Sequence, residues 1–286
     1  MTGTLLSIGH GYSARELGQR LLTKGWRVIG TTRSAEKAEA LAATGVEPLI
    51  WPGSDLGPAL SDATHLLTSV APGAEGDPVL ADAREKIGRV ASGLKWAGYL
   101  STTGVYGDRD GGWVDEDSAL TPSTKRGKAR VTAEAAWNDI PDLPLHIFRL
   151  AGIYGPGRGP FAKVQKPGAQ RIIKKNQIFS RCHVEDIATV LEASIATPHP
   201  GRIYNICDDD PAPPEDVLEY AAKILGVPVP PAVPFEEAEM SPMARSFYSD
   251  SKRVRNDRIK SELGVRLRYP TYKQALDAML RSERGE

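Results

Sequence analysis

Residues 4–22 read TLLSIGHGYSARELGQRLL, and this stretch decides the fold. A short apolar run typical of a strand is followed by Gly9-His-Gly11-Tyr-Ser-Ala14, which matches G-x-G-x-x-G/A and opens a helical pattern. The first glycine permits a tight turn, the second lets a pyrophosphate approach the backbone, and the small last residue lets the helix pack on the strand. The helix N-terminus offers free N–H groups to phosphates. We therefore predict a dinucleotide site that includes Gly9, Gly11, Tyr12 and Ser13; the alternative is a tight turn without a ligand.

The kind of dinucleotide is argued from the end of the second predicted strand, VIGTTRS at residues 28–34. An NAD site usually has an acidic residue here, which binds the ribose 2′-hydroxyl. This chain has Thr31, Thr32, Arg33 and Ser34 instead, and a guanidinium with hydroxyls would bind a 2′-phosphate through charge-assisted hydrogen bonds. The sequence favours NADP over NAD, and the alternative is a solvated Arg33 at a helix start.

The composition is that of an ordinary globular protein. The chain has 286 residues, of which 41% are hydrophobic and 25% charged, and its net charge of zero argues against a dedicated nucleic-acid binder. No run free of charged residues reaches the ~20 apolar residues of a membrane-spanning helix. The N-terminus does not resemble a signal peptide, and Cys182 and Cys207 lack metal-ligand spacing. We expect a cytoplasmic protein without a metal site, and the oligomeric state stays open.

Short β-branched runs alternate with amphipathic stretches through the first half of the chain, which predicts a doubly wound parallel α/β sheet of the Rossmann type. Strands are expected at 5–8, 27–31, 47–50, 65–70, 97–102, 145–151 and 203–207, and helices at 14–24, 35–43, 82–91 and 129–137. Residues 1–152 are predicted to form the NAD(P)-binding domain, completed by the strand near 203–207. Residues 153–286 are predicted to form mainly a smaller C-terminal lobe that binds substrate.

Several longer motifs follow in order. Residues 99–137 read YLSTTGVYGDRDGGWVDEDSALTPSTKRGKARVTAEAAW, followed by RLAGIYGPGR at 149–158, RCHVEDIA at 181–188 and IYNICDDDP at 203–211. Together with the glycine turn, these motifs resemble the extended short-chain dehydrogenase/reductases, the NAD-dependent epimerase/dehydratase family. The resemblance implies a Rossmann domain with a substrate lobe. It also implies that Ser69, Val70 and Ala71 lie against the cofactor, and that Tyr154 and Arg181 lie on the substrate side.

The chain departs from the family at its catalytic Tyr-x-x-x-Lys. The tyrosine is expected four residues after Pro122 and ten after Glu116, which is Arg126, and the lysine four further on, which is Arg130. A rival register, Thr124-x-x-x-Lys128, keeps a lysine but loses the match of Gly127 and Glu134 to the family pattern. We prefer the first register.

In the family, the tyrosine moves the substrate proton, the lysine holds the nicotinamide ribose, and a Ser or Thr orients the substrate oxygen. The position of that Ser or Thr is Thr102. Arginine has no accessible proton exchange and accepts no hydrogen bond, so Arg126 cannot replace the tyrosine as an acid or base. We expect Thr102, Arg126 and Arg130 at the catalytic position, with Arg130 also donating to the ribose. A displaced proton donor could be Tyr106, Tyr154 or Tyr12, although each is more often structural.

Two basic stretches remain. Residues 160–182 contain six Lys or Arg and no acidic residue, which indicates either a basic lid over an anionic substrate or a solvated loop. The stretch from Lys252 to Lys260 is expected to form a solvated helix face. The sequence thus favours an oxidoreductase or epimerase-like enzyme acting on an anionic or nucleotide-linked small molecule. The alternative is a dinucleotide-binding regulator or scaffold without turnover.

Overall fold

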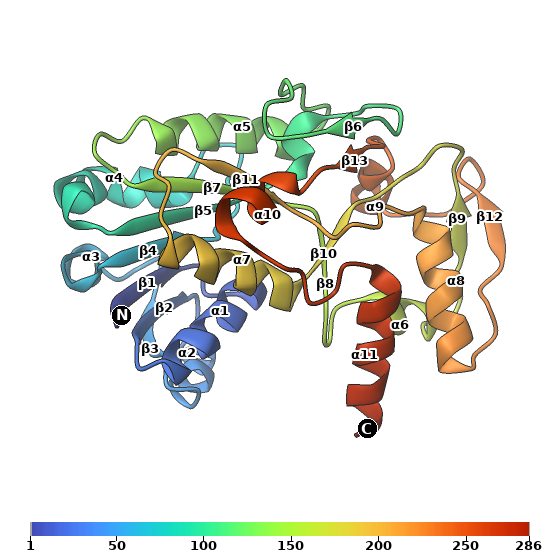
Figure 1. Cartoon of the computed structure of the whole chain (residues 1–286), viewed down its shortest axis with the longest axis horizontal. Coiled ribbons are helices and arrows are strands. Elements are labelled where there is room, and N and C mark those ends of the chain that lie inside the picture. The colour runs from blue at the N-terminus through green and yellow to red at the C-terminus, as the bar shows by residue number, and fades with distance from the viewer. Residues whose placement is uncertain (1, 286) are drawn as a thin grey trace.

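The computed structural model describes residues 2–285, apart from the side chain of Met243. A seven-stranded sheet forms the centre of the molecule, with the order β11-β7-β5-β4-β1-β2-β3 and every neighbouring pair parallel (Figure 1). The predicted doubly wound parallel sheet is confirmed. Its strands are β1 (Thr4–Ile8), β2 (Arg27–Thr32), β3 (Glu47–Ile50), β4 (His65–Thr68), β5 (Trp96–Thr102), β7 (Leu145–Leu150) and β11 (Ile203–Ile206).

Both faces of this sheet are buried, because successive side chains of a strand point to opposite faces. Leu5 belongs to the core cluster that α1 and α7 help to form, whereas Leu6 and Ile8 belong to the cluster formed with α3, α4 and α5. Such strands consist of continuous apolar runs rather than alternating ones. The helices are α1 (Tyr12–Thr23), α2 (Ala35–Ala42), α3 (Gly57–Asp62), α4 (Pro78–Val90), α5 (Lys125–Asn138) and α7 (Val184–Ala196).

The strand order reverses between β1 and β4, which are neighbours in the sheet but lie far apart in sequence. In open α/β sheets, ligands bind at the carboxyl ends of the strands where the order reverses. Gly9 follows β1 and Ser69 follows β4, so the glycine turn lies at this point of the fold.

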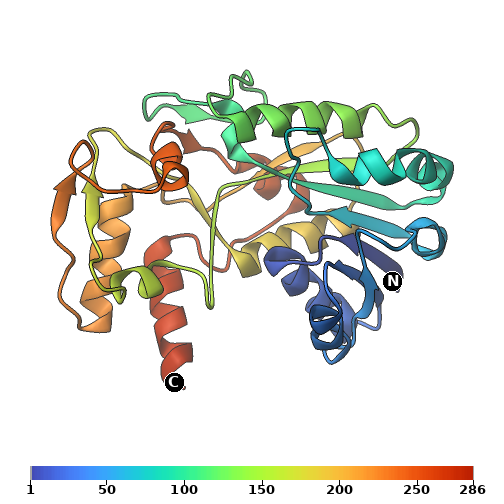
Figure 2. The same ribbon diagram turned by 180° about the vertical axis from the view of Figure 1, so that it is seen from behind.

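A third core cluster lies in the second half of the chain, beside the carboxyl end of the sheet (Figure 2). Phe161 and Val164 of α6, Ala221 of α8, and Leu276 and Met279 of α11 belong to it. We call α6, α8, α9, α11, β9 and β12 the C-terminal lobe. The bounds are α6 (Pro160–Val164), α8 (Pro214–Leu225), α9 (Pro242–Phe247), α11 (Tyr272–Arg284), β9 (Arg171–Ile173) and β12 (Ala232–Pro234).

Short elements complete the chain. The 3-10 helices are η1 (Ala91–Gly93) and η2 (Thr103–Tyr106), and helix α10 covers Asp257–Leu263. Three parallel two-stranded pairs join distant segments: β8 with β10, β6 with β13, and β9 with β12. The remaining strands are β6 (Trp113–Val114), β8 (Gly152–Tyr154), β10 (Arg181–His183) and β13 (Arg253–Val254).

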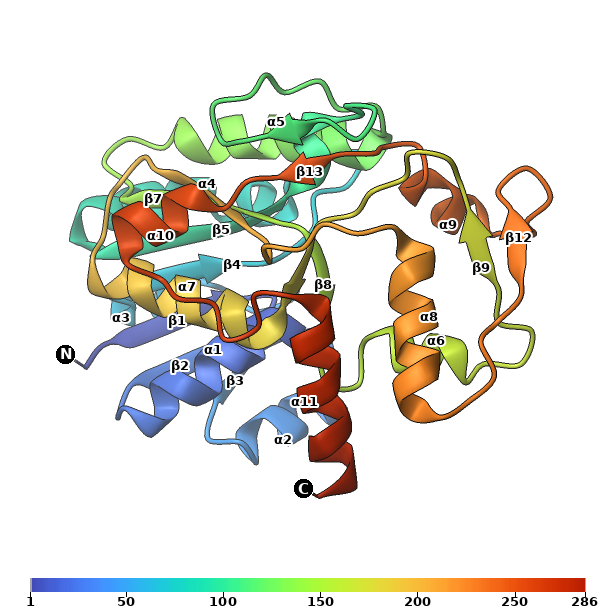
Figure 3. The ribbon, with the colours of Figure 1, turned by 45° about the vertical axis from the view of Figure 1, so that its right-hand side comes forward.

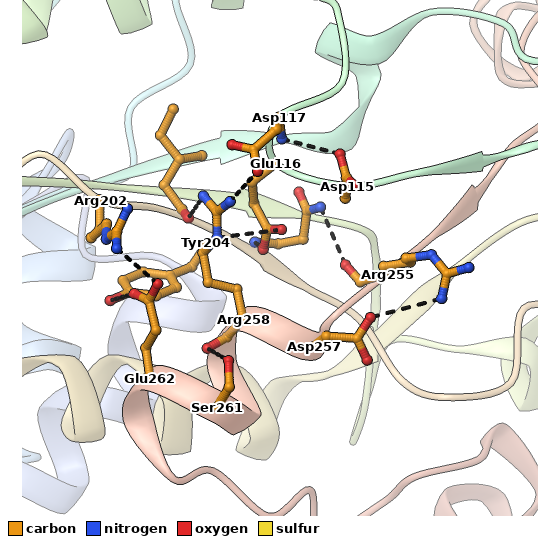
Figure 4. Close-up of polar contacts among 12 residues, drawn as sticks. Asp115, Glu116, Asp117, Arg202, Tyr204, Arg255, Asp257, Arg258, Ser261 and Glu262 are labelled. Carbon is orange, nitrogen blue, oxygen red and sulfur yellow. Dashed lines mark hydrogen bonds and ion pairs between the residues drawn. The ribbon is translucent and has the colours of Figure 1, made fainter.

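The expectation of a solvated basic helix face between Lys252 and Lys260 is wrong. Arg258 pairs with Asp117 at 2.7 Å, and its Nε lies 3.8 Å from Glu116 Oε2 (Figure 4). Lys260 pairs with Asp209 at 2.6 Å. These two cations attach α10 to acidic residues that are distant in sequence, which local charge patterns could not reveal.

None of the helices within residues 2–285 combines the length and apolar character that crossing a bilayer would require. Cys182 and Cys207 are both buried and carry free thiols.

Candidate functional site

The glycine turn is fixed by the strands on both sides of it. Gly9 has φ +79°, and its N–H donates to Thr31 Oγ1 at the end of β2 at 2.7 Å. On the other side, the Ser69 hydroxyl after β4 donates to the Gly9 carbonyl. A Cβ on Gly9 would lie 2.8 Å from Val70 Cγ2, so both the backbone conformation and the available space require glycine.

The second glycine leaves the helix N-terminus open. Gly11 is the N-cap residue of α1, no side chain caps the helix, and the first turn contains no acidic residue. A Cβ on Gly11 would find its nearest atom, the Gly9 carbonyl oxygen, at 3.8 Å. An open backbone with uncapped N–H groups suits a phosphate. The residues present therefore fit the diphosphate of a dinucleotide.

The residues predicted to bind the 2′-phosphate lie beside this turn. Thr32 ends β2 and is half-buried, Arg33 is exposed, and Ser34 caps α2 by accepting from Lys37 N at 3.4 Å. Arg33 makes no hydrogen bond or ion pair with any residue from 2 to 285, which leaves its guanidinium available to a ligand.

A cavity of about 990 Å³ runs from the glycine turn into the C-terminal lobe. It brings together most of the predicted site residues: Gly9, Gly11, Tyr12, Ser13, Ser69, Thr102, Arg126, Arg130, Tyr154 and Arg181. Thr32, Arg33, Ser34, Val70 and Ala71 are outside its lining. This volume is at the upper end of the usual range for small-molecule sites, roughly 300–1,000 Å³.

Helix α5 delivers the two arginines to the cavity. Thr124 caps α5 by accepting from Gly127 N at 3.0 Å. A Cβ on Gly127 would lie 2.8 Å from the Gly104 carbonyl oxygen, so the absence of a side chain lets the helix approach η2 closely. Arg126 and Arg130, one helical turn apart, both line the cavity together with Thr124, whereas exposed Lys128 does not. This placement agrees with the register that we preferred.

The two arginines are engaged differently. Arg130 Nη1 donates to the Tyr99 hydroxyl at 2.8 Å and to the Leu100 carbonyl at 2.7 Å, so the guanidinium is held against β5. Arg126 is exposed, and its guanidinium lies 5.4 Å from the centre of the Phe247 ring. Among residues 2–285, Arg126 has no hydrogen-bond acceptor and no acidic partner.

Thr102 ends β5 at the cavity wall. Its Oγ1 accepts a hydrogen bond from Gly104 N at 3.1 Å and caps η2. A hydroxyl has one donor and two acceptor lone pairs, so the Thr102 proton stays available to a substrate oxygen. The neighbouring Ser101 hydroxyl points elsewhere and donates to Glu134 Oε1 at 2.5 Å.

Beneath this wall lies a buried polar network. Glu134 pairs with Arg149 at 2.8 Å, Arg149 Nη1 donates to the Tyr106 hydroxyl at 3.0 Å, and Tyr106 donates to Asn205 Oδ1 at 2.7 Å. Tyr106 is fully buried, and burial raises its pKa to about 12. Its hydroxyl is occupied on both sides and does not line the cavity, which indicates a structural role.

The other two tyrosines do line the cavity. The Tyr12 hydroxyl donates to the Pro156 carbonyl at 2.9 Å, which connects the glycine turn to the loop after β8. The Tyr154 side chain is buried, and its hydroxyl has no hydrogen-bond partner among residues 2–285. Burial, together with Asp208, raises the pKa of Tyr154 far above its usual value. Tyr154 therefore carries a neutral, unpaired hydroxyl beside the cavity.

The cavity wall is strongly cationic. Seven Lys or Arg residues line it, against one acidic residue, Asp250. Asp250 pairs with Lys252 at 3.2 Å, so the other six cations have no carboxylate of their own in the lining. The cations are Arg126, Arg130, Arg158, Lys163, Lys166, Arg181 and Lys252. Such a wall favours an anionic ligand.

The predicted basic stretch 160–182 divides in two. Lys163, Lys166 and Arg181 line the cavity, whereas Arg171 pairs with Glu219 at 2.5 Å and Lys174 donates to the Tyr248 carbonyl. Part of the stretch therefore lines the cavity, whereas Arg171 and Lys174 hold the lobe together, so the alternative of a wholly solvated loop does not describe the stretch.

Sequence reasoning gave no site role to two residues of the cavity. Arg158 places its guanidinium 5.6 Å from the centre of the Tyr12 ring, and Phe247 packs against Arg126. Arg158 ends the quoted motif at 149–158 and could have been considered there, whereas Phe247 reaches the site only through tertiary contacts. Thr31, expected near the cofactor, instead accepts from the Gly9 N–H and fixes the glycine turn.

No family model matches the chain. Protein YeeZ of Escherichia coli (strain K12) is 28% identical over 279 residues, which cover 92% of this chain and 95% of that protein. A solved structure of a conserved protein of unknown function from Silicibacter pomeroyi DSS is 60% identical, with a TM-score of 0.95, over 98% of this chain and 99% of that one. A candidate NAD-dependent epimerase/dehydratase from Methylobacillus flagellatus is 26% identical, with a TM-score of 0.75, over 99% of both chains.

More distant structures share the fold alone. A UDP-glucuronic acid 4-epimerase from Bacillus cereus, in complex with NAD, is 17% identical, with a TM-score of 0.76 over 99% of both chains. A human epimerase family protein, with NADPH, is 18% identical, with a TM-score of 0.76 over 96% of this chain and 98% of that one. Proteins of this fold thus include binders of either nicotinamide cofactor.

Proposed function

We propose that the chain is an NADP-dependent oxidoreductase or epimerase-like enzyme of the extended short-chain dehydrogenase/reductase superfamily, of the NAD-dependent epimerase/dehydratase type, and that it acts on an anionic small molecule. One observation carries the proposal: a single cavity joins the glycine turn, the Thr102 hydroxyl and a wall of six cations without carboxylates in the lining to pair them. A phosphate-binding turn, an oxygen-orienting hydroxyl and an anion-binding wall are the parts that such an enzyme needs.

The turn and α1 would hold the cofactor diphosphate, since Gly11 leaves the helix N-terminus open. Arg33, with Thr32 and Ser34, would bind a 2′-phosphate, because no carboxylate stands at the end of β2 to repel it. A bound nicotinamide would supply or accept hydride.

The chemistry left to this chain is orientation and charge stabilisation. Thr102 would donate to the substrate oxygen, and Arg126 would supply positive charge for an anionic substrate without exchanging a proton. Arg130, held by Tyr99 and the Leu100 carbonyl, would fix the position of the wall. The balancing proton would come from water in the cavity or from a further donor.

Turnover tests this proposal directly. Purified protein with NADP or NADPH would be screened against hydroxy and oxo acids, phosphorylated alcohols and nucleotide sugars, with reduced cofactor followed by absorbance. A hit should be lost in Thr102→Ala and partly restored in Thr102→Ser, with NADP affinity unchanged in both. Exposed Thr132→Ala on α5 is the matched control. Full activity in Thr102→Ala would contradict the role of Thr102 in the proposal.

A second function is favoured by one specific observation. Arginines stand where the family has its tyrosine and lysine, and Arg130 is committed to contacts within the fold. A dinucleotide-binding regulator or scaffold needs no proton shuttle. Tight NADP binding without turnover of any compound in the screen would favour this alternative.

A further inference from the structure

The cations of the cavity wall fall into two groups. Arg130 donates to Tyr99 and Leu100, and Lys252 pairs with Asp250. In contrast, Arg126, Arg158, Lys163 and Lys166 make no hydrogen bond or ion pair through their side chains with any residue that the structure describes, although Arg158 lies against the Tyr12 ring as Arg126 does against Phe247. These four side chains line the cavity and are exposed to it. They are therefore the charges that a ligand can engage without displacing a contact of the fold.

The free cations lie on opposite walls. Arg126 is in the first turn of α5, which covers the central sheet, whereas Lys163 lies in α6 and Lys166 directly follows it in the C-terminal lobe. Helices α5 and α6 stand well apart in the ribbon views (Figures 1 and 3). Residues of both helices nevertheless line the same cavity, so the two groups of free cations border one continuous space.

The lobe side of the cavity gathers positive charge. Lys163 is open to the cavity but lies near Arg181 and Arg158, and partial desolvation together with these two cations lowers its pKa. Arg181 Nη1 donates to the Phe179 and Ala212 carbonyls at 2.9 and 3.1 Å, and burial lowers its pKa although the nearby Asp208 acts in the opposite direction. Partly desolvated cations that repel one another would each be stabilised by a shared anion.

The α5 side has different chemistry. Arg126 presents a planar fork of donors, which matches a carboxylate in bidentate fashion, whereas the two lysines act as point charges typical of phosphate binding. Phe247, which is 52% exposed, supports the Arg126 guanidinium without consuming its hydrogen bonds. Thr102 lines the same cavity, so a hydroxyl or carbonyl beside the carboxylate would be within its reach.

We propose that the substrate is a phosphorylated hydroxy or oxo acid, whose carboxylate binds Arg126 and whose phosphate binds Lys163 and Lys166. This inference rests on the proposed function, since it names the substrate class of the same cavity. It also assigns the residue at the former tyrosine position to substrate selection: Arg126 selects compounds with a carboxylate next to the reacting carbon.

The test is calorimetric titration of the NADP-saturated protein with matched probes. 3-Phosphoglycerate and 6-phosphogluconate carry both groups at two separations, glycerate and gluconate lack the phosphate, and glycerol 3-phosphate lacks the carboxylate. At least one two-ended probe should bind roughly tenfold or more tighter than its one-ended counterparts, which is the effect of one further charge-assisted contact.

The variants separate the two ends. Arg126→Gln should lower the affinity for the two-ended probes and for glycerate at least about tenfold, and leave the affinity for glycerol 3-phosphate unchanged. Lys163→Gln should lower the affinity for the two-ended probes and for glycerol 3-phosphate, and leave the affinity for glycerate unchanged. Lys128→Gln on α5 and Lys175→Gln after β9 are matched exposed controls and should change nothing. Binding of neither two-ended probe, equal affinity for all probes, or equal losses in both variants would overturn the proposal. NADP affinity is measured first, so loss of NADP binding contradicts the proposed function and loss of probe binding alone contradicts this inference.

Discussion

The Tyr99 hydroxyl accepts a hydrogen bond from Arg130 Nη1 at 2.8 Å, and this contact separates two arginines that look equivalent in the sequence. Burial raises the pKa of Tyr99 to about 12, so the phenol stays neutral and in place as an acceptor. The same Nη1 also donates to the Leu100 carbonyl at 2.7 Å. The Arg130 guanidinium is therefore fixed in the cavity wall by hydrogen bonds, whereas the Arg126 guanidinium is free to bind a ligand.

Substituting the two arginines should change the free energy of unfolding by different amounts. Arg130→Gln loses two hydrogen bonds from a half-buried charge, and its free energy of unfolding should fall by about 1–2 kcal/mol. Arg126→Gln removes an exposed cation that has only a ring contact, and the change should stay within about 0.5 kcal/mol. Urea unfolding of both variants measures this. Equal losses would mean that the two arginines play the same part in the fold.

Substituting the two glycines of the turn should affect different properties: Gly9→Ala should lower stability, and Gly11→Ala should lower NADP affinity. Gly9→Ala places a side chain at φ +79° and against Val70, so the protein should lose about 1–3 kcal/mol of stability. Gly11→Ala has φ −94° and an open surrounding, so the melting temperature should stay unchanged. The new methyl group would stand where the diphosphate approaches, and NADP affinity should fall at least about tenfold. If Gly11→Ala bound NADP as tightly as the unaltered protein, the diphosphate could not bind at this turn.

Arg33 should decide the choice of cofactor. Arg33→Asp replaces a free guanidinium with a carboxylate that repels a 2′-phosphate and suits a ribose hydroxyl. NADP should be weakened by at least about tenfold, and NAD should be unaffected or slightly favoured. Titration of the variant with both nucleotides measures the ratio, and Arg15→Gln on α1 is a control for general loss of positive charge. Equal losses for NAD and NADP would rule out a 2′-phosphate contact.

Acid should destabilise the fold through buried histidines. Burial lowers the pKa of each of four histidines from 6.5 to about 4: His10, His65, His146 and His183. The unfolded chain takes up their protons first, so stability is fully present above pH ~6.5 and falls as the pH drops toward ~4. His146 illustrates the cost of protonation in the folded state: its Nε2 accepts a hydrogen bond from His199 N at 2.8 Å, and a protonated Nε2 cannot accept one. Urea midpoints across this window should fall steeply, and a flat profile would contradict neutral buried histidines.

The sheet could be predicted from the sequence because its central strands are buried on both faces and form continuous apolar runs, although the edge strand β3 is largely exposed. Leu5, Leu6 and Ile8 show this, and the glycine turn after them follows from local backbone geometry. Thr102, Arg126 and Arg130, which the sequence predicted at one catalytic position, line the same cavity, and their spacing on a strand end and one helix face is local information.

What the sequence could not show depends on contacts between distant segments. The basic stretch after Ser251 looked solvated, yet Arg258 and Lys260 find Asp117 and Asp209 across the fold. The commitment of Arg130 to Tyr99 spans 31 residues, and that of Phe247 to Arg126 spans far more. Only these tertiary partners reveal which charges are free to bind a ligand.

The central claim is that the cavity starts at a working dinucleotide site. Calorimetric titration of the cofactor-free protein with NADP, NADPH, NAD and NADH tests it most directly. The account predicts tight binding of NADP or NADPH, with NAD and NADH weaker by at least about tenfold. Binding of none of the four nucleotides would contradict it, and the glycine turn would then be a structural feature of the fold without a ligand.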